Sequence, residues 1–190
     1  MSEYLKDIDT MLFLFINSHH CSFCDLVFYW TSNKWIWIPF YIFLAFIICK
    51  NSGKEFWKIL IAIAVLILFT DQLSVFIKDH VMRYRPCHNL ILQPQIHLVS
   101  GECGGLFGFI SSHAANSAGL ALFLILLFRK KITLFVYVLP AWCFIVSYSR
   151  IYLGTHYPLD VWGGWMLGIF LSLIVVYSYK KLLLKEKIKP

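Results

Sequence analysis

Five long runs of apolar residues constrain this chain more than any other feature. Each run is bounded by charged or turn residues, and together they cover about residues 35 to 49, 56 to 77, 106 to 128, 132 to 149 and 160 to 179. Only a helix satisfies its own backbone hydrogen bonds in a bilayer, and runs of this length cross or nearly cross one. The composition, 59% hydrophobic and 14% charged, is far from that of soluble domains. The sequence therefore predicts an all-α integral membrane helical bundle with about five spanning helices.

The first 34 residues hold two shorter apolar pieces, residues 11 to 16 and 26 to 30, separated by the polar segment NSHHCSFCD. We expect N-terminal interfacial helices here and no sixth span. A cleavable signal peptide is not expected, because a basic start followed by one apolar core and a small-residue cleavage site is missing. With no internal repeat or linker, residues 1–190 are predicted to form a single membrane-embedded domain.

The positive charges indicate an orientation for the bundle. Of the seventeen Lys and Arg, eleven fall in three places that five spans put on one side: Lys50, Lys54 and Lys58; Arg129, Lys130 and Lys131; Lys180, Lys181, Lys185, Lys187 and Lys189. The positive-inside rule makes that side cytoplasmic. The net charge of +7 therefore reflects topology. Since the sequence shows no basic face or aromatic platform, we expect no nucleic-acid partner.

The six cysteines fall into three pairs. Cys49 and Cys143 lie in apolar runs, where a buried thiol acts as a small hydrophobic side chain. Cys87 and Cys103 bracket the long loop on the outer side, so a disulfide between them is expected if that compartment is oxidising. The C-x-x-C that begins at Cys21 is too common to indicate redox chemistry or zinc binding, because no second ligand pair follows nearby.

The first polar group at a membrane end is the segment KDHVMRYRP. Lys78 and Arg85 are seven residues apart, which on a continuing helix places them two turns apart on one face. Two cations would then point the same way. The alternative is a snorkelling lysine and arginine that anchor the end of a span, and this segment taken alone does not decide between the two.

The second polar group comes at the start of the third apolar run, in the segment FGFISSHAANSAG. Ser111, Ser112 and His113 stand there, where free backbone N–H groups and the positive end of a helix dipole form an anion site. The alternative is an ordinary serine cap beside an interfacial histidine.

The third polar group, SRIYLGTHYPLD, joins the fourth and fifth runs. His156 and Asp160 are four residues apart, a spacing that lets a carboxylate orient an imidazole and raise the basicity of its other nitrogen. His156 is therefore a candidate nucleophile, with Arg150 close by in sequence. A buried polar pair that holds two helices together is the alternative.

The predicted topology puts all three groups at one membrane face. Together they supply three fixed cations, an anion cradle at a helix start, a histidine backed by aspartate and a second histidine. This set suits phosphoryl transfer, because the cations neutralise phosphate oxygens while one histidine attacks and the other protonates the leaving oxygen. We expect no metal and no cofactor.

The three segments resemble the signature of the type 2 phosphatidic acid phosphatase superfamily, which also includes the vanadium haloperoxidases. The family pattern is K-x6-RP, then PSGH, then SR-x5-H-x3-D. The first and third motifs match fully, whereas Ile110 and Ser112 replace the family proline and glycine of the second. The resemblance covers about residues 71 to 170. Because Ser112 has a side chain and restricts the backbone, the geometry of the phosphate loop is left open.

The resemblance implies a role for each site residue. The substrate-binding residues would be Lys78, Arg85, Ser111, Ser112 and Arg150. His113 would be the general acid, His156 the nucleophile that becomes a phosphohistidine, and Asp160 the group that orients it. The chain is similar to bacterial members that dephosphorylate undecaprenyl diphosphate, phosphatidylglycerol phosphate or lipid A at the periplasmic or outer face of the membrane.

The function expected from this resemblance is hydrolysis of a membrane lipid phosphate or diphosphate, with lipid A or undecaprenyl diphosphate as substrate. The segment SSHAAN is similar to lipid A phosphatases. The alternative is a catalytically impaired anion-binding or transport membrane protein of the same fold. The oligomeric state cannot be read from the sequence.

Overall fold

The structure, a computed structural model, describes residues 3–99, 101 and 103–188, with side chains up to residue 184. Within these ranges the chain forms helices and loops and no strand. The five longest apolar helices are α3 (Ile38–Ser52), α4 (Phe56–Val81), α5 (Ser112–Phe128), α6 (Phe135–Tyr152) and α7 (Pro158–Ile188). Each corresponds to one predicted apolar run, and the helical bundle is confirmed.

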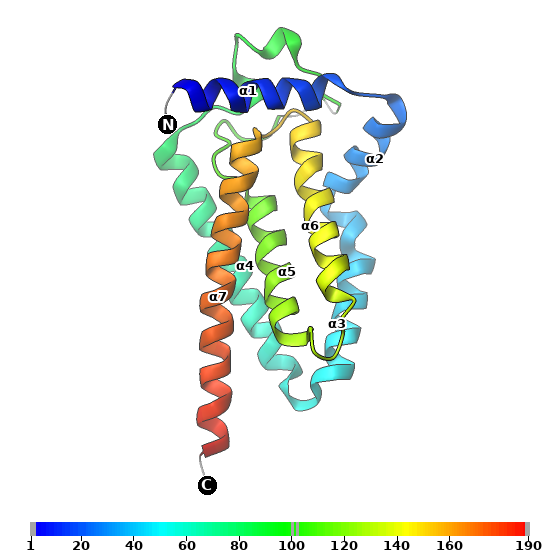
Figure 1. Cartoon of the computed structure of the whole chain (residues 1–190), viewed down its shortest axis with the longest axis vertical. Helices are drawn as coiled ribbons and strands as arrows, with labels where there is room; N and C mark the ends of the chain where they lie inside the picture. Colours follow the sequence, from blue (N-terminus) through cyan, green and yellow to red (C-terminus); the bar gives the residue numbers. More distant parts are fainter. Residues whose placement is uncertain (1–2, 100, 102, 189–190) are drawn as a thin grey trace.

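Three described helical stretches are long and apolar enough to cross a bilayer: Lys34–Val81, Phe135–Tyr152 and Pro158–Leu184. The first contains both α3 and α4, which run in opposite directions (Figure 1). Helix α5, with 17 residues, is a shorter apolar helix. Its predicted run began near residue 106, but the helix begins at Ser112. The glycine-rich segment before it stays non-helical and packs against the polar end of the bundle.

Two further helices form the N-terminal part. Helix α1 (Glu3–Ser18) lies across one end of the bundle, and α2 (Ser22–Ser32) bends away by 116° and packs beside α6 (Figure 1). The two predicted N-terminal helices are confirmed. Together they are apolar enough to cross a bilayer, but the 116° bend between them means that they would do so only as a broken span. The short helices are η1 (Lys34–Trp37), η2 (Gly53–Glu55), η3 (Pro86–His88) and η4 (Gln93–Gln95).

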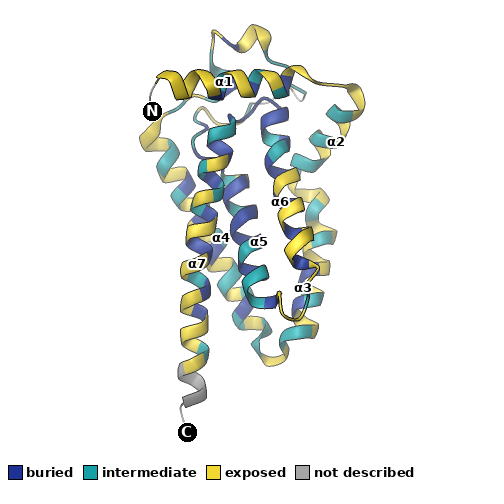
Figure 2. Ribbon diagram, in the orientation of Figure 1, coloured by how far each residue is buried: buried dark blue, intermediate teal, exposed yellow. Residues whose placement is uncertain are grey.

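Helix α5 occupies the centre of the bundle and is the most continuously buried element in Figure 2. Its contact with α7 depends on glycine. A Cβ at Gly168 would stand 2.2 Å from the Ala115 carbonyl oxygen, and one at Gly164 would stand 2.5 Å from that of Ser111. Small residues of this kind let helix backbones approach closely in a membrane. The starts of α5 and α7 are thereby brought together.

The outer faces of the helices carry large exposed apolar side chains, such as Phe69 on α4 and Phe170 on α7. A bundle of this kind places such faces against lipid. The α3–α4 turn, the α5–α6 connection and the C-terminal end of α7 lie together at the end opposite α1 (Figure 1). The predicted cationic clusters therefore share one end of the bundle, although Lys189 lies outside the described residues.

Candidate active site

The three polar groups meet at the end of the bundle beneath α1. Lys78 lies in the last turn of α4 and Arg150 in the last turn of α6. Ser111 caps α5, His156 lies in the α6–α7 loop, and Asp160 lies in the first turn of α7. Residues from four helices and two loops thus converge, as the predicted topology required.

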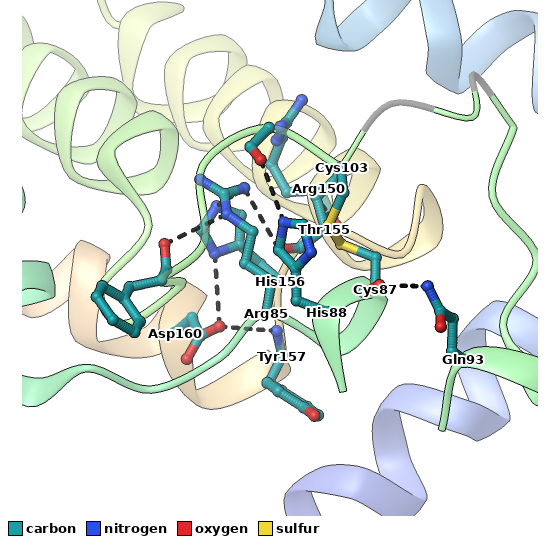
Figure 3. Close-up of a disulfide and its surroundings, with 12 residues drawn as sticks. Arg85, Cys87, His88, Gln93, Cys103, Arg150, Thr155, His156, Tyr157 and Asp160 are labelled. Atoms are coloured by element: carbon teal, nitrogen blue, oxygen red, sulfur yellow. Dashed lines mark hydrogen bonds and ion pairs between the residues drawn. A yellow bond between two sulfur atoms is a disulfide. The ribbon is translucent and has the colours of Figure 1, made fainter. Parts of the chain in front are cut away.

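His156 and Asp160 form the buried centre of this site, with 2% and 0% of their surface exposed. His156 Nδ1 lies 3.4 Å from Asp160 Oδ2 (Figure 3). The same oxygen accepts a hydrogen bond of 3.0 Å from the Tyr157 backbone N–H. A Cβ at Gly108 would stand 2.9 Å from this oxygen, so glycine there leaves room for the carboxylate. The predicted pair exists, although His156 precedes α7 and the contact is made at the helix start.

The second ring nitrogen of His156 faces a cation. His156 Nε2 lies 3.3 Å from Arg85 Nη1, and that guanidinium nitrogen also donates to the Thr155 carbonyl oxygen at 3.5 Å (Figure 3). Burial, with the charges of Arg85, Arg150 and Lys78, holds the pKa of His156 well below its ordinary value. The ring is therefore neutral at neutral pH. Its Nε2 lone pair can attack an anion held by the cations.

Arg85 reaches the site by a different route from the one expected. A continuing helix was predicted to carry both Lys78 and Arg85, but α4 ends at Val81 because Met82 adopts a left-handed conformation with φ 49°. Arg85 is extended, with φ −63° and ψ 156°, as a residue before proline must be. The chain thus turns back over the bundle and lays Arg85 across His156.

Ser112, which departs from the family pattern, has a defined place in this site. Its hydroxyl accepts a hydrogen bond from the Lys78 ammonium group and lies 2.6 Å from the Ser74 hydroxyl. Ser112 is the first residue of α5 and has no left-handed φ, since Met82 is the one non-glycine residue in the described chain with a positive φ. The side chain therefore causes no backbone strain. It positions Lys78.

Ser111 shapes the start of α5. Its hydroxyl accepts a hydrogen bond from the Ala114 N–H at 3.5 Å, and its own N–H donates to the Asp160 carbonyl oxygen at 2.8 Å. Capping holds the first turn in place, where the N–H groups of Ser112 and His113 have no partner within the helix. These two N–H groups are the ones suited to an anion.

Two cavities of about 550 Å³ each border the candidate site residues. One is largely apolar, runs between α3, α4, α5 and α6, and includes Ser112 and His113 in its wall. The other is more polar and includes Arg150 and Thr155. The buried Arg150 Nε has no hydrogen-bond partner among the described residues. A guanidinium group with an uncommitted donor is suited to binding a phosphate oxygen.

Sequence reasoning gave Arg83 no role, yet it links α1 to the site. Arg83 Nη1 donates to Asp160 Oδ1 at 2.8 Å, and Nη2 donates to Asp9 Oδ2 at 2.6 Å. Asp9 in turn accepts from the Leu159 N–H at 2.8 Å. The available signal was the buried face of α1, on which Asp9 stands at i, i+4 spacing from Phe13. An acid on such a face needs a partner.

The cysteines give a mixed result. Cys87 and Cys103 are bridged, as expected, and the bridge closes the outer loop beside the polar cavity (Figure 3). Cys21 and Cys24 are also bridged, which their spacing alone did not predict. Cys143 is buried as expected, but the prediction for Cys49 is wrong because this residue is exposed on α3, at the edge of the bundle.

Known proteins are similar to this chain in sequence and in fold. The chain is 42% identical over 177 residues to a lipid A 4'-phosphatase of Bacteroides thetaiotaomicron, covering 90% of this chain and 76% of that protein. It is 36% identical over 185 residues to the lipid A 4'-phosphatase of Porphyromonas gingivalis, covering 94% and 77%.

Two solved structures have a similar fold. Aquifex aeolicus LpxE has a TM-score of 0.62 and 25% identity, covering 88% of this chain and 94% of that one. A PAP2-type phosphatidylglycerolphosphate phosphatase from Bacillus subtilis has a TM-score of 0.68 at 21% identity, covering 99% and 89%, and supports the fold alone. The model of the PAP2 superfamily matches residues 55–183. This multi-pass membrane protein therefore belongs to the PAP2 superfamily.

Proposed function

We propose that this protein removes a phosphate group from lipid A by way of a phosphohistidine on His156. A membrane lipid phosphatase is supported by its lipid A 4'-phosphatase relatives and by the LpxE fold. The observation that carries the proposal is the arrangement of His156, whose Nδ1 faces Asp160 while Nε2 faces Arg85. Undecaprenyl diphosphate is the second candidate substrate.

In the first step, the phosphate of the lipid binds among Lys78, Arg85 and Arg150 and the N–H groups at the start of α5. Nε2 of His156 attacks phosphorus in line, and the bond from phosphorus to the lipid oxygen breaks. His113 donates a proton to that oxygen, so the lipid leaves as an alcohol. The cations lower the barrier because they stabilise the charge on the transferring phosphoryl group.

In the second step, water attacks the phosphohistidine. His113, now neutral, takes a proton from that water, the bond between phosphorus and Nε2 breaks, and inorganic phosphate leaves. Asp160 keeps the ring of His156 oriented and supports its positive charge throughout. At the end of the cycle the transferred proton is back on His113 and His156 is neutral.

The two cavities fit an amphiphilic substrate. The apolar cavity that includes His113 lies along helices that cross the membrane, so it can hold the start of an acyl chain near the leaving oxygen. The polar cavity that includes Arg150 lies on the side of the disulfide loop and suits a sugar head group. Ser32 on α2 borders both cavities.

We further propose that the site faces the periplasm or the cell exterior. The positive-inside rule puts the opposite, lysine-rich end in the cytoplasm. Both disulfides, Cys21–Cys24 and Cys87–Cys103, lie at the end that holds the site, which fits an oxidising compartment. In intact cells, a cysteine placed at Gln95 should react with an impermeant thiol reagent and one placed at Lys130 should not. The reverse labelling would overturn this orientation.

Phosphate release from a panel of purified lipids tests the function. Lipid A should be hydrolysed faster than undecaprenyl diphosphate or phosphatidylglycerol phosphate, activity should survive excess chelator, and vanadate should inhibit it as a mimic of the transition state. A need for added magnesium would refute the metal-free reaction. Phosphate binding without turnover of any lipid would favour the alternative, a catalytically impaired anion-binding protein. The buried His156–Asp160 pair argues against that alternative, because a protein that only binds an anion requires no nucleophile.

A further inference from the structure

A second cluster of polar side chains lies on the same end of the bundle, beside the junction of α1 and α2. His20, Asp25 and His97 each offer one ligand atom, and these atoms lie within 4.8 Å of one another. His97 Nε2 is 3.0 Å from Asp25 Oδ2, and the rings of His20 and His97 stack with centroids 3.7 Å apart. We infer that this cluster is a zinc site, distinct from the catalytic centre.

The donor set favours a transition metal. Two imidazoles and one carboxylate suit Zn²⁺, whereas Mg²⁺ and Ca²⁺ prefer oxygen donors alone. Neighbouring ligands of a tetrahedral zinc ion at its usual bond lengths are about 3.3 Å apart. His97 and Asp25 are already near this separation, and the exposed His20 stands in the turn between α1 and α2. A small rotation of the His20 ring completes three ligands, and water takes the fourth position.

The ligands are held in place by a second layer of contacts. The Tyr152 hydroxyl donates to Asp25 Oδ1 at 2.6 Å and holds the carboxylate against His97, whose Nε2 lies 3.1 Å from Oδ1 and 3.0 Å from Oδ2. The buried Asn17 fixes the backbone of His97 on both sides, since its Oδ1 accepts from the His97 N–H at 2.8 Å and its Nδ2 donates to the His97 carbonyl oxygen at 2.9 Å. Outer-layer contacts of this kind orient the ligands of metal sites.

The ion would join the α1–α2 turn and the adjacent first turn of α2 to the loop around residue 97, which lies 72 positions beyond Asp25 in the chain. That loop packs on the catalytic loop, since a Cβ at Gly154 would stand 2.9 Å from Leu98 Cδ2 and 3.0 Å from Ile96 Cγ2. Gly154 is two residues before His156. Zinc here stabilises the α1–α2 turn and the loop around residue 97, which pack over the site. It takes no part in hydrolysis, so turnover in the presence of chelator is compatible with a zinc site here.

The test uses the full chain, purified through an affinity tag without histidine, stripped with chelator and then loaded with zinc chloride. Wild type should retain about one zinc per chain by elemental mass spectrometry. Its melting temperature should rise by about 5 °C, as expected for a ligand at saturating concentration on a chain of this size.

His20→Gln is the sharpest variant, because it leaves the Asp25–His97 and Tyr152–Asp25 contacts in place. It should bind zinc at least about tenfold more weakly and lose the rise in melting temperature. His80→Gln is the matched control, since His80 is exposed on α4 and bonds the Phe76 carbonyl oxygen at the same end of the bundle. It should behave as wild type. A wild type that retains no zinc, or a His20→Gln protein that binds and is stabilised like wild type, would overturn the inference.

Discussion

Replacing Arg83 with glutamine tests two roles of this side chain, one in stability and one in catalysis. Arg83 joins Asp9, which is 1% exposed, to Asp160, which is fully buried. Without the guanidinium, both carboxylates remain buried without their cationic partner. Removing one partner of a buried ion pair costs about 3 to 5 kcal/mol of unfolding free energy. For a chain of this length that corresponds to a fall in melting temperature of about 6 to 20 °C.

The same substitution should also slow catalysis. Asp160 would lose its bond to Arg83 Nη1 and retain the one from the Tyr157 N–H. It would then orient His156 less well and favour its protonated form. We expect kcat on a lipid substrate to fall at least about tenfold, equivalent to about 1.4 kcal/mol of transition-state stabilisation.

Asp9→Asn provides the comparison, because it weakens the link to α1 but keeps the Arg83–Asp160 bond. It should lower the melting temperature and leave kcat within about threefold of wild type. Arg129→Gln, which changes an exposed arginine at the opposite end of the bundle, should affect neither quantity. Thermal unfolding and initial rates, measured well below the lowest melting temperature, test these expectations. A kcat for Arg83→Gln within twofold of wild type would refute this role of Arg83.

Three further variants or conditions test the proposed roles. His113→Ala should lose turnover of lipid but keep measurable activity on p-nitrophenyl phosphate, whose phenolate leaves without a proton; equal loss on both substrates would contradict its role as the acid. Ser112→Ala should raise KM by about five- to tenfold with little change in kcat, because the Lys78 ammonium loses a charged hydrogen bond; an unchanged KM would argue against that contact. Because the pKa of His156 is lowered by burial and by Arg85, Arg150 and Lys78, its active neutral form should persist as pH falls. The acid limb of kcat/KM for p-nitrophenyl phosphate should therefore lie below pH 6.5, and a limb at or above that value would show an ordinary histidine.

Local spacing predicted much of this site. The intervals that separate Lys78 from Arg85 and His156 from Asp160 lie within single helix ends or short loops. The order of the apolar runs was enough to bring those ends to one face. The left-handed turn at Met82 was not predictable, since nothing in its side chain favours a positive φ. The site was therefore found even where the expected helix was too long.

Contacts between distant segments could not be predicted in the same way. The Arg83–Asp9 bond joins residues 74 positions apart, and its formation depends on α1 lying across the bundle. His97 meets Asp25 across 72 positions in a loop without periodic pattern. The role of Ser112 could not be predicted either, because its hydroxyl contacts Lys78 only through the packing of α5 against α4.

The central claim is a covalent phosphoryl group on His156. Wild-type protein mixed with lipid A labelled in its phosphate, quenched within milliseconds and digested, should yield an acid-labile and base-stable phosphopeptide that contains residue 156. His156→Ala should yield none and release no phosphate. A phosphoryl group on another residue, or steady phosphate release by His156→Ala, would contradict the account.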